Sequence, residues 1–499
     1  MEHVFSKYSG ADRLRNPFVF VGVSLLLVFL ATLIAKGGIF ISLALLFLPI
    51  ALIYIYAILI EPKVGMYGLF FYNFIALGLG RYIDFFPVGM GVDAHLLLVY
   101  VSLIFNSFVY DIPWKRVKSE FFILAVIWYG YSVLQLFNPE AASREAWFYA
   151  MRSVSLYMIM TIPLVRMIFN KRKDLDLFFI IWGVMSILAT LKGMMQLYIG
   201  VDRWEQAWLD AGSAVTHILF GKLRIFSFMS DAGQFGGAQG HAGVVFMILA
   251  IFEKKSFKLR VFYLIVGLMG LYGMMISGTR GSIAVPFAGL ALFVFVRKNI
   301  RAMILGAILG LSIFVFFKYT YIGQGNYTIQ RMRTAFNPED ASLMVRVENQ
   351  RRLKAYMASR PFGGGLGSSG GWGLRFSPNT FLANVPTDSW YVAIWAEQGI
   401  VGLMLHLFIL FYVLGKSAYL IMFKLRNDEV KYKLSALAAG MFGIMAASYG
   451  NGVLGQMPTG IIIYSSIAYL SMAQELDEEK ESVENLINSE QSRNPMLPA

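Results

Sequence analysis

The stretch PFVFVGVSLLLVFLATLIA at residues 17–35 has no charged side chain and is long enough to cross a lipid bilayer as a helix. Stretches of the same kind recur along the chain, separated by polar segments. They predict an all-α, polytopic integral membrane protein with about fourteen transmembrane helices. These helices are expected near residues 17–35, 39–60, 65–80, 94–110, 121–138, 148–169, 177–200, 239–253, 261–278, 283–296, 302–321, 390–415, 435–451 and 459–473.

The composition excludes other broad classes of protein. Of the 499 residues, 57% are hydrophobic and 15% are charged, whereas a soluble chain is about one quarter charged. The chain is therefore neither an ordinary soluble protein nor a disordered one. It has no cysteine, which excludes disulfides and thiolate metal sites. We expect neither a metal nor another cofactor.

The net charge of +13 is explained by where the basic residues lie. They gather in every second short connector between the expected helices, as is typical of cytoplasmic loops. This alternation predicts cytoplasmic N- and C-termini and makes a nucleic-acid partner unnecessary. The basic connectors are residues 115–118, 171–173, 254–260, 297–301 and 424–433.

Two connectors, residues 201–240 and 323–389, are too long to be turns, and both fall on the outer side. Long loops in compact proteins are usually functional or disordered. Aromatic residues, glycines and arginines in these two favour ordered, functional loops with short helices. The expected organisation is N-terminal transmembrane helices at 1–200, an extracytoplasmic loop at 201–240, transmembrane helices at 241–322, a large extracytoplasmic catalytic loop at 323–389, C-terminal transmembrane helices at 390–473 and an acidic cytoplasmic tail at 474–499.

The second outer loop contains a helical pattern followed by a glycine-rich run. Residues 340–359 predict a helix with its N-cap at 340–342, and Pro361 closes it. The run GGGLGSSGG follows at residues 363–371. It contains a G-x-G-x-x-G match, but no strand precedes it, which argues against a dinucleotide site. Two interpretations stay open: a tight turn, or a backbone surface that a glycan can approach at Gly363, Gly365 and Gly367.

Arginines are concentrated on the outer side, where the charge rule for membrane loops does not explain them. Arg224 in the first outer loop and Arg280 between two helices join a group in the second loop. Some are expected to pair with acids such as Glu339, Asp340 and Glu348. The others predict an anion site at membrane level, because guanidinium groups grip phosphate in a bidentate manner. The second-loop group is Arg331, Arg333, Arg346, Arg351, Arg352 and Arg360.

Other candidate residues carry weaker signals. Asp174 and Asp176 form a D-x-D pattern like that of metal-dependent glycosyltransferases, but they lie in a basic cytoplasmic connector, which favours solvated charge. His406 lies within an apolar helix and is expected to be a hydrogen-bonded packing residue. His241 and His217 are each compatible with a structural role.

The outer segments resemble the bacterial O-antigen polymerase/ligase superfamily. In that family an arginine begins an amphipathic helix that ends in a Pro-x-x-Gly-x-Gly run. Here Arg346 is followed by NQRRLKAY at 349–356 and RPFGGGLG at 360–367. Other segments also resemble the family in order and spacing, and together the likeness spans about residues 220–420. They are RIFSFMSD at 224–231, GTRGS at 278–282, DSWYV at 388–392 and AEQGIVGL at 396–403.

The resemblance, together with the outer arginines, implies a pyrophosphate-binding set. Arg224, Arg280 and Arg346 are its members, with Arg352 as a less secure fourth. The implied ligand is a polyprenyl pyrophosphate that carries an oligosaccharide in the membrane lipid. The resemblance also implies the bacterial inner membrane as location, and a chain-length regulator or a flippase as candidate protein partners.

The resemblance further implies a general base near residue 388. Ligase members carry His-Asn where this chain has Asp388–Ser389, and the histidine is the expected base there. The carboxylate at this position favours a polymerase. Glu397 and His241 are weaker catalytic candidates.

The sequence thus predicts a metal-independent membrane glycosyltransferase. It would move a glycan from the carrier lipid to a sugar hydroxyl of another lipid-linked repeat unit, as O-antigen, capsule or exopolysaccharide polymerases do. One alternative is an O-antigen ligase or a protein O-oligosaccharyltransferase. A second alternative is a polysaccharide flippase or transporter, although a transporter would place its charges within helices near the membrane midplane.

Overall fold

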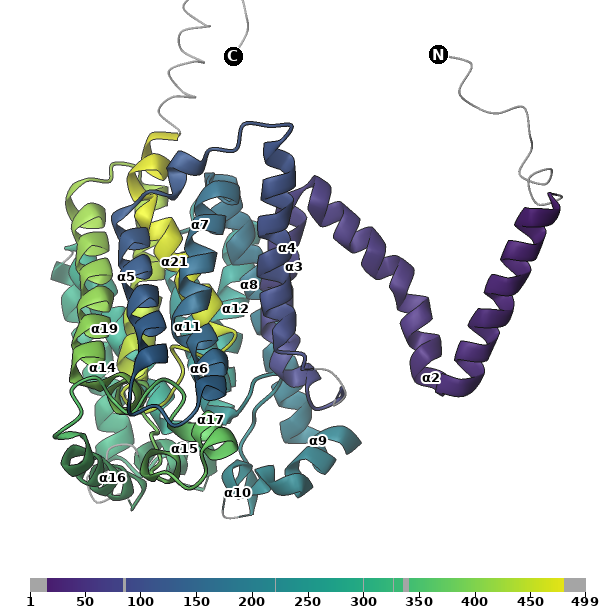
Figure 1. Cartoon of the computed structure of the whole chain (residues 1–499). Helices are drawn as coiled ribbons and strands as arrows, with labels where there is room; N and C mark the ends of the chain where they lie inside the picture. The colour runs from purple at the N-terminus through teal and green to yellow at the C-terminus, as the bar shows by residue number, and fades with distance from the viewer. Residues whose placement is uncertain are drawn as a thin grey trace, which may run out of the picture.

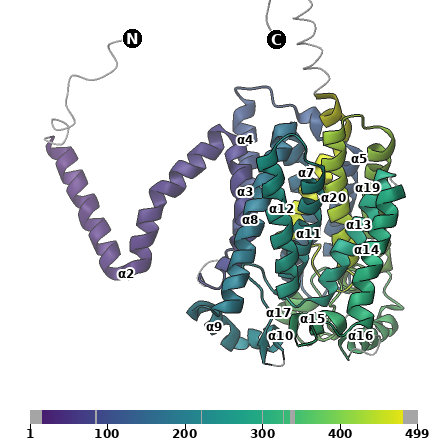
Figure 2. The same ribbon diagram turned by 180° about the vertical axis from the view of Figure 1, so that it is seen from behind.

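The computed structural model describes residues 16–479, apart from 84–86, 220, 299, 326 and 335–340. Long helices dominate it, and they lie side by side in one bundle (Figures 1 and 2). Helix α2 (Pro17–Ile60) projects from the bundle. The bundle helices are α3 (Pro62–Leu79), α4 (Met90–Ser107), α5 (Glu120–Leu134), α6 (Arg144–Met151), α7 (Tyr157–Ile168), α8 (Arg172–Tyr198), α11 (Ala232–Phe252), α12 (Phe257–Ile276), α13 (Ala284–Arg297), α14 (Ile300–Tyr319), α19 (Trp390–Phe423), α20 (Asp428–Ala447) and α21 (Thr459–Ser471).

Short elements fill the connectors. The single sheet among the described residues is one antiparallel pair, in which β1 (Ile218–Leu219) lies against β2 (Lys222–Leu223). The short helical elements are η1 (Trp114–Val117), η2 (Gln135–Phe137), η3 (Arg152–Leu156), α9 (Arg203–Trp208), η4 (Leu209–Ser213), α10 (Ala214–His217), η5 (Arg280–Ile283), α15 (Tyr327–Arg333), α16 (Ala341–Met357), α17 (Gly370–Phe376) and α18 (Phe381–Asn384). The predicted helix at 340–359 is therefore present as α16.

The prediction of an all-α, polytopic membrane protein is confirmed. Within the described residues, nine helices are long and apolar enough to cross a membrane, and three shorter apolar helices accompany them. Every stretch predicted as a membrane helix coincides with a helix. The first two stretches form one bent helix, α2, whose two arms make a V beside the bundle (Figure 1).

Helix α11 begins at residue 232, earlier than the predicted start at 239, so the first long connector is shorter than 201–240. Its side-chain cap explains the start, because Asp231 Oδ1 accepts hydrogen bonds from the backbone N–H groups of Gly233 and Gln234. The glycine- and glutamine-rich first turns look like loop in the sequence. In the structure they are buried, because small residues let neighbouring helices approach closely.

The contact between α11 and α12 shows this close approach. A Cβ on Gly270 of α12 would lie only 2.7 Å from the backbone nitrogen of Gly243 on α11. The two backbones therefore touch, and any side chain at Gly270 would separate them. This pairing holds α11, and with it the segment that precedes it, firmly against the rest of the bundle.

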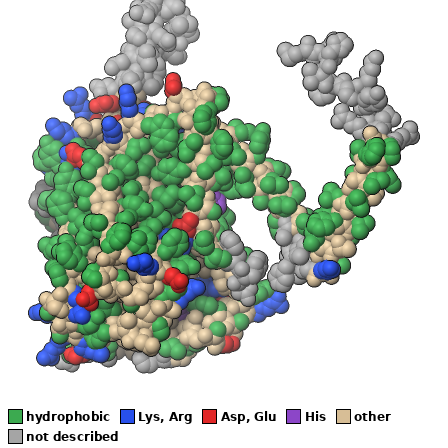
Figure 3. Space-filling model, in the orientation of Figure 1, with side chains coloured by type: hydrophobic (Ala, Val, Ile, Leu, Met, Phe, Trp, Pro, Cys, Tyr) green, Lys and Arg blue, Asp and Glu red, His purple; other side chains and the backbone are tan. Residues whose placement is uncertain are grey.

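The two ends of the bundle differ. Helices α9, α10, α15, α16 and α17 gather at one end, called here the loop end, and the described chain finishes at the other (Figures 1 and 2). On the face shown in Figure 3, hydrophobic side chains cover most of the middle, and charged side chains gather mainly towards the two ends. The two long connectors therefore share one end of the molecule.

The opposite end is crossed by ion pairs between connectors, and is called here the paired end. Arg166 donates to Glu475 at 2.9 Å, and Asp174 accepts from Lys63 at 2.9 Å. Lys433 pairs with Asp176 and with Glu429. The D-x-D carboxylates are thus held in ion pairs, whereas the sequence suggested solvated charges. No group of three or more potential metal ligands occurs among the described histidine, aspartate and glutamate residues.

Candidate functional site

The loop end contains a direct contact between two residues from the sequence prediction. Arg346 on α16 places Nε 3.3 Å from Oδ2 of Asp388, just before α19. Both side chains are partly exposed, with 36% and 49% of their surface accessible. The pair is therefore formed and still open to a ligand.

A turn after α20 lies beside this pair. A Cβ on Gly450 would lie 3.9 Å from Nη1 of Arg346. The next residue, Asn451, accepts a 3.3 Å hydrogen bond at its carbonyl from the backbone N–H of Trp390. The turn thus contacts both Arg346 and the start of α19, two positions after Asp388.

The side chain of Asn451 extends from this turn towards two other motifs. Its Nδ2 lies 2.7 Å from where a Cβ would stand on Gly281, and its Oδ1 lies 3.5 Å from the corresponding point on Gly233. Gly281 follows Arg280, and Gly233 opens α11. Asn451 therefore lies between the Arg280 turn, the N-terminus of α11 and the Arg346–Asp388 pair.

Arg224 reaches the same turn from the first long connector. Its Nη2 donates to Oγ1 of Thr279 at 3.1 Å, and its Nη1 donates to the carbonyl of Thr216 at 3.2 Å. Thr279 Oγ1 in turn donates to the carbonyl of Ala232 at 2.8 Å. Arg224 is thereby placed next to Arg280 and the start of α11.

Arg280 begins η5, and its Nη1 donates to Oγ1 of Thr334 at 3.0 Å. Arg331 on α15 donates through Nε to the carbonyl of Gly278 at 2.5 Å, two residues before Arg280. Helix α15 is thus fastened to the Arg280 turn. Through these bonds and close approaches, the segments that carry Arg224, Arg280, Asn451, Arg346 and Asp388 adjoin one another across the loop end, and they are called here the arginine path.

Arg81, in the connector after α3, holds the segment that carries Arg224. It donates to the carbonyls of Ser227 and Met229, and its guanidinium lies 4.3 Å from the ring centre of Phe226 and 4.5 Å from that of Trp208. Burial lowers the pKa of Arg81 to about 10, so the group stays protonated at neutral pH. Its charge is used for positioning.

His217 belongs to the same packed region. Its ring meets Trp208 and Phe226 edge to face, at centroid distances of 4.8 and 5.4 Å. Burial lowers the pKa of His217, although the hydrogen bond to Ser213 opposes the shift. The structural role expected for His217 agrees with this packing.

Glu397 is buried behind the Arg346–Asp388 pair. Its Oε1 accepts from the hydroxyl of Ser369 at 2.8 Å and from the backbone N–H of Ser369 at 3.3 Å. The hydroxyl of Ser369 also lies 3.4 Å from Oγ1 of Thr387, the neighbour of Asp388. The structure thus places Glu397 where it fixes the glycine-rich turn to α19.

The glycine-rich run packs inside the protein, which corrects the expected glycan-facing surface. Gly363, Gly365 and Gly367 are all buried, and all have positive φ. A Cβ on Gly363 would lie 2.4 Å from the carbonyl oxygen of Glu397, and one on Gly367 would lie 2.5 Å from that of Ala146. Backbone contact with α6 and α19 requires these glycines, so the tight-turn interpretation matches the structure.

His241, a weaker candidate for the base, does not reach the path. It lies within α11, is 1% exposed, and its ring contacts Trp182 at a centroid distance of 4.7 Å. A Cβ on Gly440 would lie 2.5 Å from its Nε2. His241 is therefore enclosed between helices, which disagrees with a role as base at the loop end.

Two further predicted residues are placed clearly. His406 Nε2 accepts a 2.9 Å hydrogen bond from the indole of Trp390 and is buried, which confirms its interpretation as a packing residue. Arg352 is exposed on α16. It lies six positions after Arg346, about 120° around the helix axis, so the helix does not direct the two side chains to the same side.

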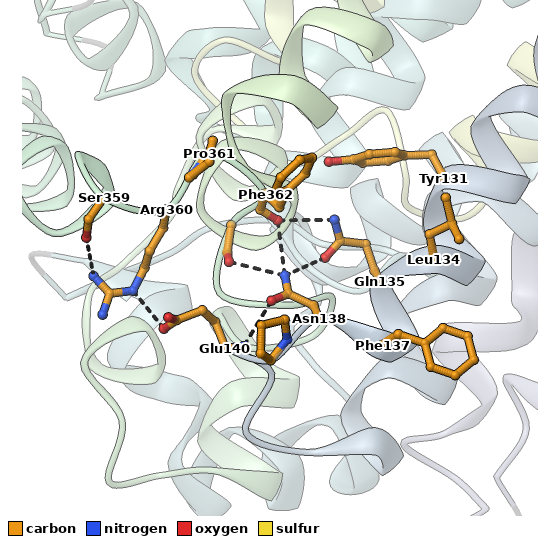
Figure 4. Close-up of a pocket in the computed structure, with 12 residues that line it drawn as sticks. Tyr131, Leu134, Gln135, Phe137, Asn138, Glu140, Ser359, Arg360, Pro361 and Phe362 are labelled. Carbon is orange, nitrogen blue, oxygen red and sulfur yellow. Dashed lines mark hydrogen bonds and ion pairs between the residues drawn. The ribbon is translucent and has the colours of Figure 1, made fainter.

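One cavity lies beyond the C-terminal end of α16, between the α5–η2 segment and residues 359–363 (Figure 4). Its volume is about 390 Å³. Gln135 and Asn138 direct their amides at the carbonyl of Phe362, each at 3.1 Å, and Arg360 pairs with Glu140 at 2.9 Å. These polar groups are bonded within the protein, and the cavity is not lined by Arg224, Arg280, Arg346 or Asp388.

Sequence reasoning missed the residues that join the motifs. Asn451 and Gln456 lie after α20, and Ser230 donates to Oε1 of Gln456 at 3.1 Å. Gln234 donates to Oγ1 of Thr459 at 2.8 Å. No local sequence pattern marks an amide side chain in a short connector as part of a site. The one available signal was the polar break between two apolar helices.

Comparison with known families agrees with the geometry. Residues 264–407 match the O-antigen ligase family. This segment includes Arg280, Arg346 and Asp388, and the match supports the likeness to the O-antigen polymerase/ligase superfamily. The resemblance noted in the sequence is thereby confirmed. No curated protein matched the chain with significance.

Members of this family are glycosyltransferase-like enzymes that act on lipid-linked oligosaccharides. The apolar helices identify a membrane protein, and within it residues 264–407 match this family. Arg224 and Asn451 lie outside the matched segment, although the structure brings both to the same path. The family match therefore includes Arg280, Arg346 and Asp388 of the candidate site but not Arg224 or Asn451.

Proposed function

We propose that this protein is a bacterial inner-membrane polysaccharide polymerase. It transfers a glycan from a polyprenyl pyrophosphate carrier to a sugar hydroxyl of another lipid-linked repeat unit. The observation that carries the proposal is the path of contacts from Arg224 through Arg280 and Asn451 to the Arg346–Asp388 pair.

The arginines supply what the leaving group needs. Displacement at the anomeric carbon breaks its bond to the pyrophosphate oxygen, and negative charge grows on the pyrophosphate as the bond breaks. Guanidinium groups held in place by the protein stabilise that charge in the transition state. Arg224 and Arg280 are fixed by neighbouring hydroxyls, so little reorganisation is required of them.

Asp388 supplies the group that acts on the acceptor. The acceptor hydroxyl forms the new bond to the anomeric carbon and loses its proton, which a carboxylate can accept. Arg346 fixes the orientation of the carboxylate through the 3.3 Å contact. Because Asp388 is 49% exposed, a sugar hydroxyl has access to it. No step in this scheme calls for a metal.

The orientation of the chain belongs to the same proposal. The paired end, with its basic connectors, is assigned to the cytoplasm, and the loop end to the outer face. On the outer face no nucleotide is needed, because the donor is already activated as a pyrophosphate.

A direct assay tests the function against its alternatives. Purified protein in proteoliposomes is given lipid-linked repeat units as the sole substrate, and the products are separated by size. A ladder of polymers with release of polyprenyl pyrophosphate is expected. Transfer that occurs only after lipid A or a protein acceptor is added would assign a ligase, and movement of the substrate without any new glycosidic bond would assign a transporter.

A further inference from the structure

A second, smaller cavity lies near the paired end of the bundle, where α13 and α19 end and α20 begins. Its volume is about 200 Å³. None of the residues used in the proposed reaction lines it. Its lining consists of Val296, Arg297, Lys298, Met422, Asp428 and Lys431.

The cavity holds an excess of positive charge. Three of its lining residues are cations, Arg297, Lys298 and Lys431, and one is an anion, Asp428. Among the ion pairs recorded for the described residues, none involves any of these four. Three cations and one carboxylate leave a net charge of about +2 in a small volume, and the mutual repulsion is relieved when an anion binds.

The neighbouring basic residues behave differently. Lys255 pairs with Glu429, and Lys433 pairs with both Glu429 and Asp176. The same connectors therefore contain a neutralised network and, beside it, an uncompensated one. A general excess of cytoplasmic basic residues explains their number, but it does not explain why those in the cavity are left without carboxylate partners.

Two of the cations are held in place by aromatic rings. The guanidinium of Arg297 lies 4.8 Å from the ring centre of Phe252, and Nζ of Lys298 lies 3.6 Å from that of Phe423. These contacts fix the cations without neutralising them. The site is thus prepared for an anion.

The backbone of Lys298 ends α13 and so fixes where its side chain starts. Lys298 is the C-cap of the helix, with φ 52° and ψ 25°, a left-handed conformation that often ends helices. Its N–H donates to the carbonyl of Phe295 at 3.2 Å. The end of α13 therefore sets the position of this lysine at the cavity.

The surroundings of the cavity are apolar. Val296 and Met422 form part of its wall, and Phe295 and Phe423 beside it are 59% and 60% exposed. These residues end two helices that are apolar enough to cross a membrane. A ligand with an anionic head and a hydrocarbon body fits both parts of this environment.

We propose that the cavity binds the phosphate of an anionic glycerophospholipid from the bilayer leaflet at the paired end. The phosphate lies among Arg297, Lys298 and Lys431, and the acyl chains extend past Phe295 and Phe423. Free phosphate has the same head chemistry and lacks the chains. The inference does not depend on the proposed glycosyl transfer.

Native mass spectrometry of the full-length protein with added phosphatidylglycerol tests the site. Each basic residue at an anionic lipid contributes about fivefold to affinity. Lys298→Gln/Lys431→Gln is therefore expected to weaken lipid retention about 25-fold, whereas Lys298→Arg/Lys431→Arg retains it. The control is Lys254→Gln/Lys258→Gln, which removes two exposed lysines, one from the connector before α12 and one from its first turn, and should leave retention unchanged.

Two further measurements distinguish a lipid phosphate from free phosphate as the ligand. Phosphatidylcholine, which has no net charge, should bind no more tightly to the wild type than to the double glutamine variant. Inorganic phosphate should compete with the lipid only weakly, because it buries no hydrocarbon. The proposal would be overturned if the control variant lost lipid to the same extent, or if the double glutamine variant retained lipid like the wild type. Full competition by inorganic phosphate would mean that the site binds a free anion and not a lipid.

Thermal unfolding separates loss of the site from loss of the fold. In detergent without added lipid, wild type and Lys298→Gln/Lys431→Gln are expected to unfold at similar temperatures. Phosphatidylglycerol should raise the unfolding temperature of the wild type and of the control by more than that of the double glutamine variant, since a ligand stabilises the state that binds it.

Discussion

Arg346 and Asp388 are 42 positions apart in the chain, yet Nε of the arginine lies 3.3 Å from Oδ2 of the aspartate. The contact joins α16 to the start of α19 at the loop end. Because the two side chains are in contact, the position of each depends on the other, and a change in either alters how both bind a ligand.

Replacement of Arg346 tests the anion site. Arg346→Ala is expected to lower polymer formation about 10- to 100-fold, because a charge-assisted bond to phosphate contributes about 1.5–3 kcal/mol. Arg346→Lys should restore part of the loss. The measurement is polymer yield and length in cells that depend on the variant, with protein level checked by immunoblot. Arg351→Ala on the same helix serves as the matched control, and an equal effect there would contradict a specific role for Arg346.

Replacement of Asp388 tests whether its carboxylate acts as a general base or only orients the acceptor. Asp388→Asn keeps the size of the side chain and is expected to lower the rate at least about 100-fold if the carboxylate accepts the proton. Glu348→Gln removes an exposed carboxylate of α16 and should have little effect.

A double-mutant cycle with Arg346→Ala identifies the route by which Asp388 acts. Loss in the double variant that exceeds the loss in Arg346→Ala alone is expected from a base. A double variant no worse than Arg346→Ala would mean that Asp388 acts only by holding the arginine.

Glu397→Gln tests whether that buried residue takes part in the chemistry. An amide oxygen can still accept from the hydroxyl and the N–H of Ser369. Activity per folded molecule is therefore expected to stay within about threefold of wild type, because both hydrogen bonds that position the turn are kept. Glu397→Leu should lower the unfolding temperature. Complete inactivity of a stable Glu397→Gln protein would return Glu397 to the list of catalytic residues.

Two glycine substitutions in α19 test the kink at Gly399, where the helix contacts the backbone just before the glycine-rich run. Gly399 has φ 71°, and a Cβ there would stand 2.0 Å from the carbonyl oxygen of Pro361. Gly399→Ala is expected to destabilise the fold by about 1–3 kcal/mol or to prevent it. Gly415→Ala on the same helix meets nothing within 4 Å and should be neutral or slightly stabilising. Unfolding temperatures in detergent provide the measurement, and equal values for the two variants would disprove the contact.

The orientation is open to cysteine labelling, because the chain contains no cysteine of its own. Asp210→Cys and Gly371→Cys lie in the two long connectors, and Lys258→Cys lies in the first turn of α12, next to a basic connector. A reagent that does not cross membranes is expected to label the first two in intact spheroplasts and the third only after the membrane is opened. Labelling of all three from the same side would exclude the proposed topology.

The sequence predicted the helices because membrane helices follow from length and hydrophobicity alone. The start of α11 was missed, since Gly233 and its neighbours look polar or flexible until the surrounding helices bury them. The tight turn at Gly363 was one of two interpretations, because positive φ and backbone contact cannot be read from a glycine run. Asn451 was not considered, because its role depends on contacts with segments distant in the chain.

The position of Asn451 has a consequence for protein engineering. The family-matched segment ends at residue 407, but the amide that lies between the Arg280 turn and the start of α11 comes from the connector after α20. A chimaera that exchanges residues 264–407 alone would import Arg280, Arg346 and Asp388 and leave Arg224 and Asn451 to the recipient. The smallest transplantable module therefore extends from the segment before α11 to the turn after α20, and recombination inside it separates residues that meet only in the folded protein.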